Sequence, residues 1–328
     1  MQKIFNLVFE GGGVLGISYL GVLKYLHENN IMKDIKRTAG TSAGAITACI
    51  TSFDLSFEET KAIADSLDYR KIPDRDGANE LDIIPAKTRE ELEKLFGDLE
   101  CLYRLVTNYG WYSTNYFYTW LQKQIANQFD KTKKLPPYTF KDFKDSSLHK
   151  GGRPFLDLYI IGTDVSCKTS RIFSHLTTPN MEVAEAVRIS MSIPLFFEAN
   201  KVKDYSINNS ENIHIFSDGG IMRNYPINIF DTNKINYQTL GCKFKDASQC
   251  LPINNLPQFI SNYFLCYTKI QQDIYNNNPQ DIKRSIEIDT GTVSIIDFNI
   301  TANDATYNFL FNQGYEAAKA YFSRFSQF

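Results

Sequence analysis

Two glycine-bearing turns near the N-terminus constrain what this chain can fold into more than any other feature. The turn Glu10-Gly11-Gly12-Gly13-Val14-Leu15-Gly16 follows an apolar segment at 4–9, and Gly40-Thr41-Ser42-Ala43-Gly44 follows a short strand predicted at 36–39. Each turn precedes a segment with helical spacing of apolar residues, so each is predicted to join a strand to a helix. Such units build an α/β fold with parallel strands, whose sites gather beyond the carboxyl ends of the strands.

The second turn has the pattern G-x-S-x-G, in which small neighbours permit a sharp turn that exposes the Ser42 hydroxyl. An ordinary structural explanation also exists, because serine is common near the N-terminal cap of a helix. The first turn is predicted to point backbone N–H groups at an anion, such as the oxyanion that attack by a serine creates. In the α/β-hydrolase fold the nucleophile follows several strands and a histidine comes last, and Ser42 comes too early for that order.

The base that would activate Ser42 is predicted to be a carboxylate. All four histidines have ordinary positions: His27 ends a helix, His149 lies in a loop, His175 follows a strand and His214 alternates along one. A carboxylate can act as general base when it is close to the hydroxyl and partly desolvated. Asp218-Gly219-Gly220 ends an apolar strand that begins at residue 213, so Asp218 has suitable surroundings.

The remainder of the chain adds helices and strands around this framework. Residues 54–150 read as an inserted helical cap, with a helix start at 54–59, a solvated helix at 88–96 and an exposed lysine- and proline-bearing connection at 131–137. Its aromatic cluster is expected to pack the cap, with an acyl pocket as the alternative; the cluster is Tyr109, Trp111, Tyr112, Tyr116, Phe117, Tyr118 and Trp120. Further elements are predicted as a strand at 155–162 that leads to Asp164, helices at 180–191, 257–275 and 304–325, and a strand pair at 286–289 and 293–298.

The composition of the chain limits the kinds of partner and cofactor that we expect it to bind. A formal net charge of -2 gives no reason to expect nucleic acid. Six cysteines without a C-x-x-C pattern suggest neither a zinc cage nor a disulfide scaffold, no acidic cluster has calcium-loop spacing, and no metal or cofactor is expected. The absence of a signal peptide and of an apolar run long enough to span a bilayer predicts a cytoplasmic-type soluble protein that contacts membranes peripherally.

Together these segments resemble the patatin-like phospholipases. Gly11 to Gly16 matches their glycine-rich loop, 40–44 their nucleophile elbow and 218–220 their D-G-G/A motif, and the likeness extends to 162–165, 186–194 and 224–226. The resemblance implies an α/β, three-layer fold with a mostly parallel central sheet flanked by helices. It implies one domain over 1–328, with the helical insertion at about 54–150 and a C-terminal helical elaboration at about 255–328.

The resemblance also implies a Ser-Asp dyad that cleaves acyl esters of membrane phospholipids. Carried over by position, Ser42 is the nucleophile, Asp218 the base, and the N–H groups of Gly11, Gly12 and Gly13 the oxyanion hole. Three alternatives stay open: transfer of the acyl group to an acceptor other than water, action on neutral lipids or small esters, and a catalytically silent binding module. Glu10 and Leu15 depart from the family pattern, which often has a basic residue there, so headgroup choice is expected to differ. A protein or small-molecule activator, and delivery as a secreted effector, are further expectations from the family.

Overall fold

The computed structural model describes residues 3–74, 88, 93, 98–203, 213–245 and 252–324. Its main sheet has the strand order β10-β9-β1-β2-β4-β8-β7, with β5 paired to β4, and a small second sheet pairs β3 with β6. The strands are β1 (Asn6–Phe9), β2 (Arg37–Thr41), β3 (Gly110–Tyr112), β4 (Asp157–Asp164), β5 (Thr169–Ser174), β6 (Leu195–Phe197), β7 (Asn200–Lys203), β8 (Ile213–Asp218), β9 (Thr239–Phe244) and β10 (Ser285–Ile288).

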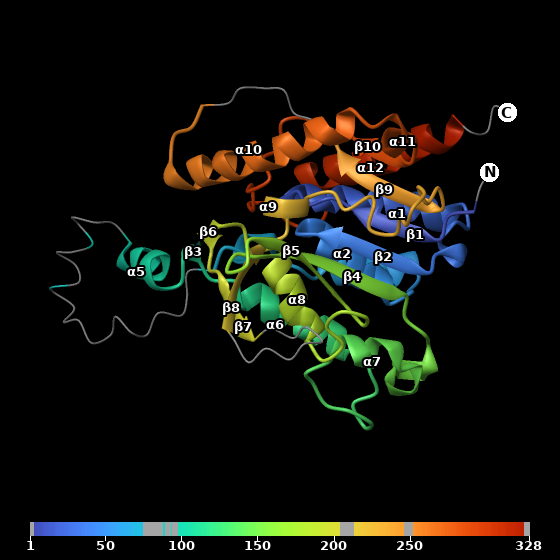
Figure 1. Cartoon of the computed structure of the whole chain (residues 1–328), viewed down its shortest axis with the longest axis horizontal. Helices are drawn as coiled ribbons and strands as arrows, with labels where there is room; N and C mark the ends of the chain where they lie inside the picture. The colour runs from blue at the N-terminus through green and yellow to red at the C-terminus, as the bar shows by residue number, and fades with distance from the viewer. Residues whose placement is uncertain are drawn as a thin grey trace.

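Helices surround the main sheet. They are α1 (Ser18–Glu28), α2 (Ala43–Ser52), α3 (Phe57–Asp65), α5 (Leu99–Thr107), α6 (Asn115–Ala126), α7 (Phe140–Lys144), α8 (Val183–Ser190), α9 (Gly220–Arg223), α10 (Leu256–Asn276), α11 (Pro279–Lys283) and α12 (Ala305–Ser323). Short 3₁₀ helices are η1 (Gly13–Ile17), η2 (Met32–Asp34), η3 (Tyr69–Lys71), η5 (Ser146–Leu148) and η6 (Lys150–Gly152). In Figure 1, α10 and α12 lie near the β9–β10 end of the sheet, and α6, α7 and α8 near the β4 end.

Pairing in the sheet is parallel from β10 through β4 and antiparallel beyond it. β1 pairs with β9 and β2, β10 pairs with β9, and β2 pairs with β4, all in parallel. β4 then pairs antiparallel with both β5 and β8. The fold is therefore α/β with a mostly parallel central sheet, as the sequence predicts.

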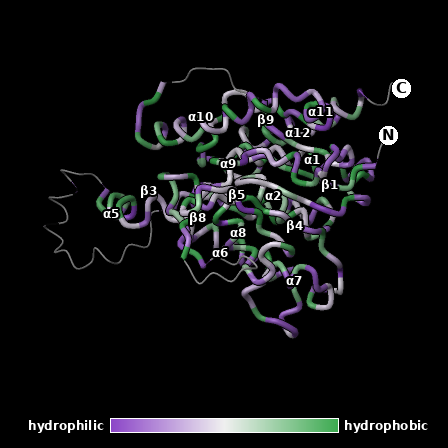
Figure 2. Tube along the Cα trace, in the orientation of Figure 1, coloured by the Kyte–Doolittle hydropathy of each residue, from purple (hydrophilic) through white to green (hydrophobic). Residues whose placement is uncertain are grey.

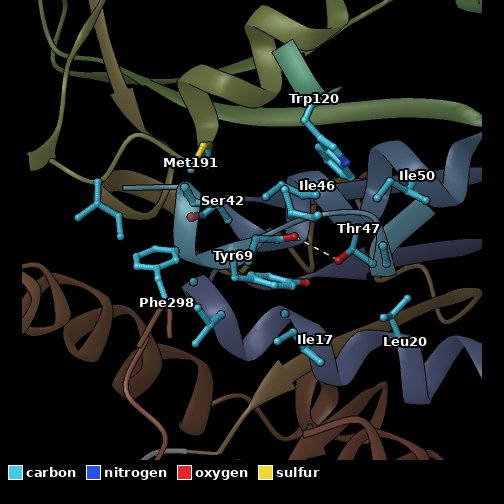
Figure 3. A pocket seen from close by; sticks show the side chains of 18 of the residues that line it. Ile17, Leu20, Ser42, Ile46, Thr47, Ile50, Tyr69, Trp120, Met191 and Phe298 are labelled. Atoms are coloured by element: carbon cyan, nitrogen blue, oxygen red, sulfur yellow. Dashed lines mark hydrogen bonds between the residues drawn. The ribbon is translucent and has the colours of Figure 1, made fainter. Parts of the chain in front are cut away.

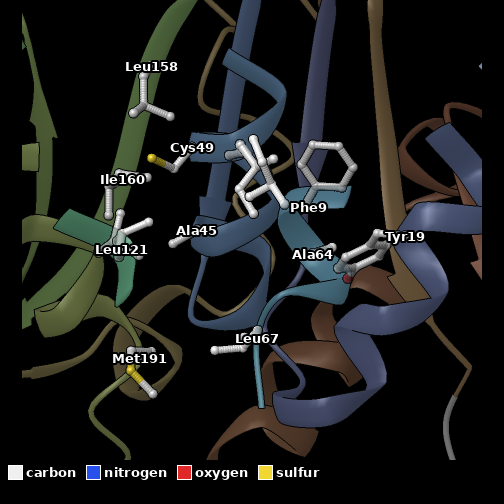
Figure 4. Close-up of a cluster of buried hydrophobic side chains, with 14 of the residues drawn as sticks. Phe9, Tyr19, Ala45, Cys49, Ala64, Leu67, Leu121, Leu158, Ile160 and Met191 are labelled. Carbon is white, nitrogen blue, oxygen red and sulfur yellow. The ribbon is translucent and has the colours of Figure 1, made fainter. Parts of the chain in front are cut away.

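The core fills the space between the sheet and α1, α2, α6 and α12. Figure 4 shows Phe9 and Ile160 of the sheet facing Ala45 and Cys49 of α2. On the opposite face a smaller cluster joins Val8 and Ala39 to Ile227 and Phe230 of the segment after α9. Burial on both faces explains why Leu7, Val8 and Phe9 of β1 are consecutive apolar residues and do not alternate with polar ones. In Figure 2 hydrophilic residues gather on outer loops such as those around α7.

Local signals set the ends of several helices. At α3 the Ser56 side chain accepts the Glu59 N–H and the Glu59 carboxylate accepts the Ser56 N–H, which forms a capping box. At α10 the Asn255 side chain accepts the Gln258 N–H, and a proline occupies the first turn. These caps place the two helices where sequence analysis predicts them.

One predicted strand is wrong, and one predicted helix falls outside the described residues. Residues 293–298 form turns and extended chain, and they pair with no strand in the part of the chain that the structure describes. The reason is a competing contact, because the Ile295 carbonyl accepts the Val14 N–H of the glycine-rich turn. The helix predicted at 88–96 lies outside the described residues, apart from positions 88 and 93.

The segment 54–150 is mainly helical where it is described, but its elements spread over the molecule. α6 packs against α8, α3 contacts α1 and α2, and β3 pairs with β6 of a distant segment. Sequence analysis missed strands β3, β6, β7 and β9, each only three to six residues long.

Candidate active site

Ser42 and Asp218 meet where two strands share one edge of β4. β2 pairs with the first part of β4, and its last pair joins Thr41 to Ile161. β8 comes from the opposite direction and pairs with the next part of β4, and its last pair joins Asp218 to Gly162. The carboxyl ends of β2 and β8 therefore face each other across consecutive residues of β4, which brings together two side chains that are 176 residues apart in the sequence.

Ser42 occupies a backbone conformation that ordinary residues rarely adopt. Its φ is 53° and its ψ is -121°, between the end of β2 and the start of α2. For a residue with a Cβ this conformation costs on the order of 1–3 kcal/mol, and such outliers cluster at active sites. The Ser42 N–H donates to the Ser190 hydroxyl at 2.9 Å, so α8 holds the turn. The glycines allow it, because a Cβ on Gly40 would lie 2.1 Å from the Gly44 carbonyl oxygen.

Asp218 is completely buried, and its two carboxylate oxygens differ in their hydrogen bonding. Its Oδ1 accepts the Gly220 N–H at 2.7 Å, whereas its Oδ2 has no hydrogen-bond partner in the described part of the chain. Burial raises the pKa of Asp218 to about 7, against the opposing effects of the Gly220 N–H and the Ser42 side chain. A buried, unpaired carboxylate oxygen is costly, and its pKa suits a general base at neutral pH.

The glycine-rich turn lies beside Ser42. A Cβ on Gly11 would be 3.1 Å from Ser42 Cβ, and a Cβ on Gly44 would be 2.3 Å from the Phe9 carbonyl oxygen. Gly13 has φ +56°, and a Cβ there would meet the Ile295 carbonyl oxygen at 2.0 Å. Side chains are therefore excluded at these positions, and the two turns pack backbone against backbone.

The three glycines differ in how their amides are used. Gly11 donates its N–H to the Asn224 carbonyl at 3.1 Å. The N–H groups of Gly12 and Gly13, unlike that of Gly11, have no acceptor among the described residues.

Asn224, which follows α9, joins the turn to the Asp218 segment. Its carboxamide donates to the Gly11 carbonyl at 3.2 Å and to the Glu10 carboxylate at 3.4 Å. Gln271 of α10 accepts the Asn224 N–H and donates to the Gly220 carbonyl. α10 is thus tied to both sides of the site.

An apolar cavity of about 70 Å³ opens beside Ser42 (Figure 3). Ile46 and Ile50 of α2, Trp120 of α6 and Phe298 of the segment after β10 are among its lining residues. Figure 3 shows Ser42 at one end, near Met191 and Phe298. A mainly apolar cavity with Ser42 at one end suits a hydrocarbon chain whose polar end reaches the serine.

Of the predicted aromatic cluster, only Trp120 lines this cavity. Phe117 is fully buried, and Tyr118 donates its hydroxyl to Glu182, which fits the expected packing role. Leu15 is buried and is not among the residues that line the cavity. Sequence analysis missed Phe298, because residues 293–298 read as a strand.

The remaining predicted residues have structural roles. His149 stacks on Phe155 and bonds two backbone carbonyls, whereas His27 and His175 lie at the ends of α1 and β5. His214 pairs with Asp164 at 2.7 Å, and Asp164 also accepts the Cys167 N–H, which fixes the turn after β4 as expected.

Three further observations concern metals, membranes and cysteines. Asp164, Cys167 and His214 lie close enough to hold an ion, but the same Asp164 oxygen is already paired with His214 and Arg171. Among the described residues no helix is long and apolar enough to cross a bilayer. The five described cysteines form no disulfide with one another.

Comparison with known proteins shows which family the chain belongs to. The family model for patatin-like phospholipases matches residues 7–231. Protein R571 of Acanthamoeba polyphaga mimivirus is 26% identical over 97% of this chain and 93% of its own length. Protein YqhO of Bacillus subtilis is 29% identical over 69% of this chain and 67% of its own.

Among solved structures, VipD from Legionella pneumophila superposes with a TM-score of 0.61 at 19% identity, over 98% of this chain and 67% of that one. At this identity the likeness concerns the fold alone. The family model covers both glycine-bearing turns, Ser42 and Asp218, and on that match the chain belongs to the patatin-like phospholipase family.

Proposed function

We propose that this protein is a phospholipase A-type lipid acyl hydrolase with Ser42 as nucleophile and Asp218 as general base. The observation that carries the proposal is the junction on β4, where a strained, buried serine faces a buried aspartate with an unpaired oxygen. Asp218 Oδ2 has no structural partner among the described residues, and the proton of a nearby hydroxyl gives it one.

The reaction proceeds in two steps. Ser42 Oγ attacks the ester carbonyl carbon while Asp218 takes the hydroxyl proton, and the N–H groups of Gly12 and Gly13 stabilise the oxyanion. Collapse of this intermediate breaks the ester bond, and Asp218 passes the proton to the leaving lysolipid oxygen. Asp218 then takes a proton from water, which attacks the acyl-serine, and the proton returns to Ser42 as the fatty acid leaves.

Gly11 is assigned a different role from the one that sequence analysis predicts. Its N–H already donates to Asn224, so we assign the oxyanion donors to Gly12 and Gly13. Gly11 instead allows the close approach to Ser42 that a side chain would block.

The surface of α10 supports contact with a lipid layer. Phe259, Tyr263, Ile270 and Ile274 are all at least half exposed, and their spacing places them on one side of the helix. Exposed apolar and tyrosine side chains of this kind suit the interface between lipid and water. An activator and delivery as an effector stay predictions.

The test is release of fatty acid from vesicles of phosphatidylcholine, of phosphatidylglycerol and from a triacylglycerol emulsion. Wild type is expected to cleave phospholipid, and Ser42→Ala to lose about 10⁴-fold or more of the rate. The matched control is Ser56→Ala, which removes only the cap of α3 and is expected to keep the rate.

A fluorophosphonate probe separates the alternatives. Labelling of wild type and not of Ser42→Ala, without phospholipid cleavage, would favour another acyl donor or acceptor. Phospholipid cleavage at equal rates by wild type and Ser42→Ala would contradict the assignment of the nucleophile.

A further inference from the structure

A second cavity lies behind the glycine-rich turn, on the other side of the sheet from the core that contains the apolar pocket. Its volume is about 200 Å³, and most of the residues that line it are polar. Glu10, Asn224, Lys243 of β9, and Gln272 and Tyr275 of α10 are among the residues that line it. Since one water needs only about 10–15 Å³ of such volume, the cavity has room for a small polar molecule.

Lys243 is an unusual residue for this position. Only 2% of its side chain is exposed, and all six residues of β9 are buried. Its ammonium lies 4.0 Å from the Tyr275 ring centre and 3.9 Å from the Glu287 carboxylate, which is itself 37% exposed. No hydrogen bond of this ammonium is found in the described residues, although an ammonium carries three donors.

The two carboxylates that line the cavity, Glu10 and Asp281, form no ion pair with Lys243 among the described residues. Both Asp281 oxygens are bonded elsewhere, by Arg284 and Asn278. Both Glu10 oxygens are engaged, one by the Phe244 N–H at 2.8 Å and the other by Asn224 at 3.4 Å. Burial raises the pKa of Glu10 to about 7, and the charge of Lys243 opposes that shift.

The Tyr275 hydroxyl is shielded from solvent and makes no hydrogen bond of ordinary geometry among the described residues. Its nearest polar neighbour is the Ser285 hydroxyl, which already bonds the Tyr225 hydroxyl and the Asp281 carbonyl.

A buried cation and a buried hydroxyl that lack partners are costly unless a ligand or ordered water satisfies them. Three facts thus coincide in one place: an open polar volume, a lysine without a hydrogen-bonded counter-ion and a tyrosine hydroxyl without an acceptor. A ligand that carries negatively charged oxygen atoms would occupy the volume, pair with the lysine and accept a hydrogen bond from the tyrosine hydroxyl.

We propose that this cavity is a second ligand site that binds a small oxyanion, a phosphate or carboxylate group, with Lys243 as its counter-ion and the Tyr275 hydroxyl as a further donor. The site is separate from Ser42 and does not depend on the proposed hydrolase activity. Its ligand would lie beside Glu10, the residue that precedes the glycine-rich turn.

The test is calorimetric titration of the Ser42→Ala protein, so that no turnover contributes heat. The three probes are inorganic phosphate, glycerol 3-phosphate and acetate. We expect one saturable site for at least one probe, and binding weaker by about tenfold or more in Lys243→Met. Tyr275→Phe keeps the ring beside Lys243 and is expected to weaken binding by a smaller factor.

Lys245→Met is the matched control, because Lys245 lies two residues further along, is 55% exposed and pairs with Asp289. It should bind as the parent does. Tighter binding of glycerol 3-phosphate than of phosphate would identify a lipid headgroup fragment as the ligand, and equal binding would identify the free anion.

Either of two results would overturn the proposal: no saturable binding of any probe, or equal binding by the parent, Lys243→Met and Tyr275→Phe. Circular dichroism checks that each variant folds. If Lys243→Met does not fold, Tyr275→Phe decides the outcome, because it removes one hydroxyl and leaves the ring in place.

Discussion

Asp164 and Asp218 end neighbouring strands, β4 and β8, and neither exposes any of its surface, yet their surroundings are opposite. Asp164 is bonded by His214, by Arg171 and by the Cys167 N–H. Asp218 receives one backbone N–H and keeps an unpaired oxygen beside Ser42.

The difference appears in the pKa values of the two acids. The pKa of Asp164 is lowered because its hydrogen bonds outweigh burial, which acts to raise it. The pKa of Asp218 is raised to about 7 because burial prevails. Burial alone therefore does not identify a functional acid; the absence of partners for a buried oxygen is the better guide.

The largest expected effect is the loss of catalytic activity when Asp218 is replaced. Asp218→Asn removes the proposed base without changing the size of the side chain, and we expect kcat to fall by about 10⁴-fold. The measurement is hydrolysis of a short-chain phospholipid, with circular dichroism to confirm folding. A variant that kept the wild-type rate would show that Asp218 is not the base.

The next effect is on stability as a function of pH. A carboxyl whose pKa is raised on folding stabilises the folded state at low pH, and this contribution is lost as pH rises from about 4 to about 7. Asp218→Asn escapes the loss, so its free energy of unfolding relative to wild type should increase between pH 4 and pH 8, by up to about 4 kcal/mol. Urea unfolding at several pH values measures it, and a difference that does not change with pH would contradict the raised pKa.

The catalytic rate should depend on the same ionisation, that of the Asp218 carboxyl group. Only the ionised form of Asp218 can accept the Ser42 proton, so kcat/KM should rise with pH and level off above about 7. At pH 5 we expect a rate about a hundredfold below the plateau. A soluble ester assayed between pH 5 and pH 9 tests this, after a check that the enzyme stays folded at each pH. A flat profile across that range would assign the base to another group.

The smallest effect concerns Asp164. Asp164→Asn leaves Arg171 and His214 without their carboxylate, and because Arg171 is partly exposed we expect a loss of about 2 kcal/mol of unfolding free energy at pH 7. This contribution should shrink at low pH, since an acid with a lowered pKa stabilises above its usual pKa and less as pH falls.

In the same Asp164→Asn variant, the folded fraction should keep the wild-type rate. If fully folded Asp164→Asn lost activity, Asp164 would have a role in catalysis, and the assignment of a purely structural role to it would be wrong.

Much of this site could be predicted from sequence because its parts are local. Glycines mark turns whose backbone excludes side chains, and Gly13 and Gly40 have the close contacts that such turns require. Ser42 and Asp218 each follow a short apolar strand, and that placement could be recognised without knowing the pairing. The partners of Asp218 could not be predicted, because they depend on how β4 divides its edge between β2 and β8.

Features that depend on distant contacts were missed. Residues 293–298 have strand-like residues, but the Ile295 carbonyl bonds the glycine-rich turn instead of a neighbouring strand. Strand β9 contains Lys243, and a charged residue in a short apolar run normally indicates an exposed position. Only the structure shows that this lysine is buried behind the turn.

The junction on β4 also has a consequence for synthesis of the chain. The proposed nucleophile, Ser42, is in place once about the first fifty residues have emerged, but its proposed base comes 176 residues later and must pair with β4 in the correct register. A one-residue slip of β8 would turn Asp218 to the other face of the sheet. A polypeptide that stalls on the ribosome, or is cut by a protease before β8, would therefore carry Ser42 without its base, and catalytic competence would arise only late in biogenesis.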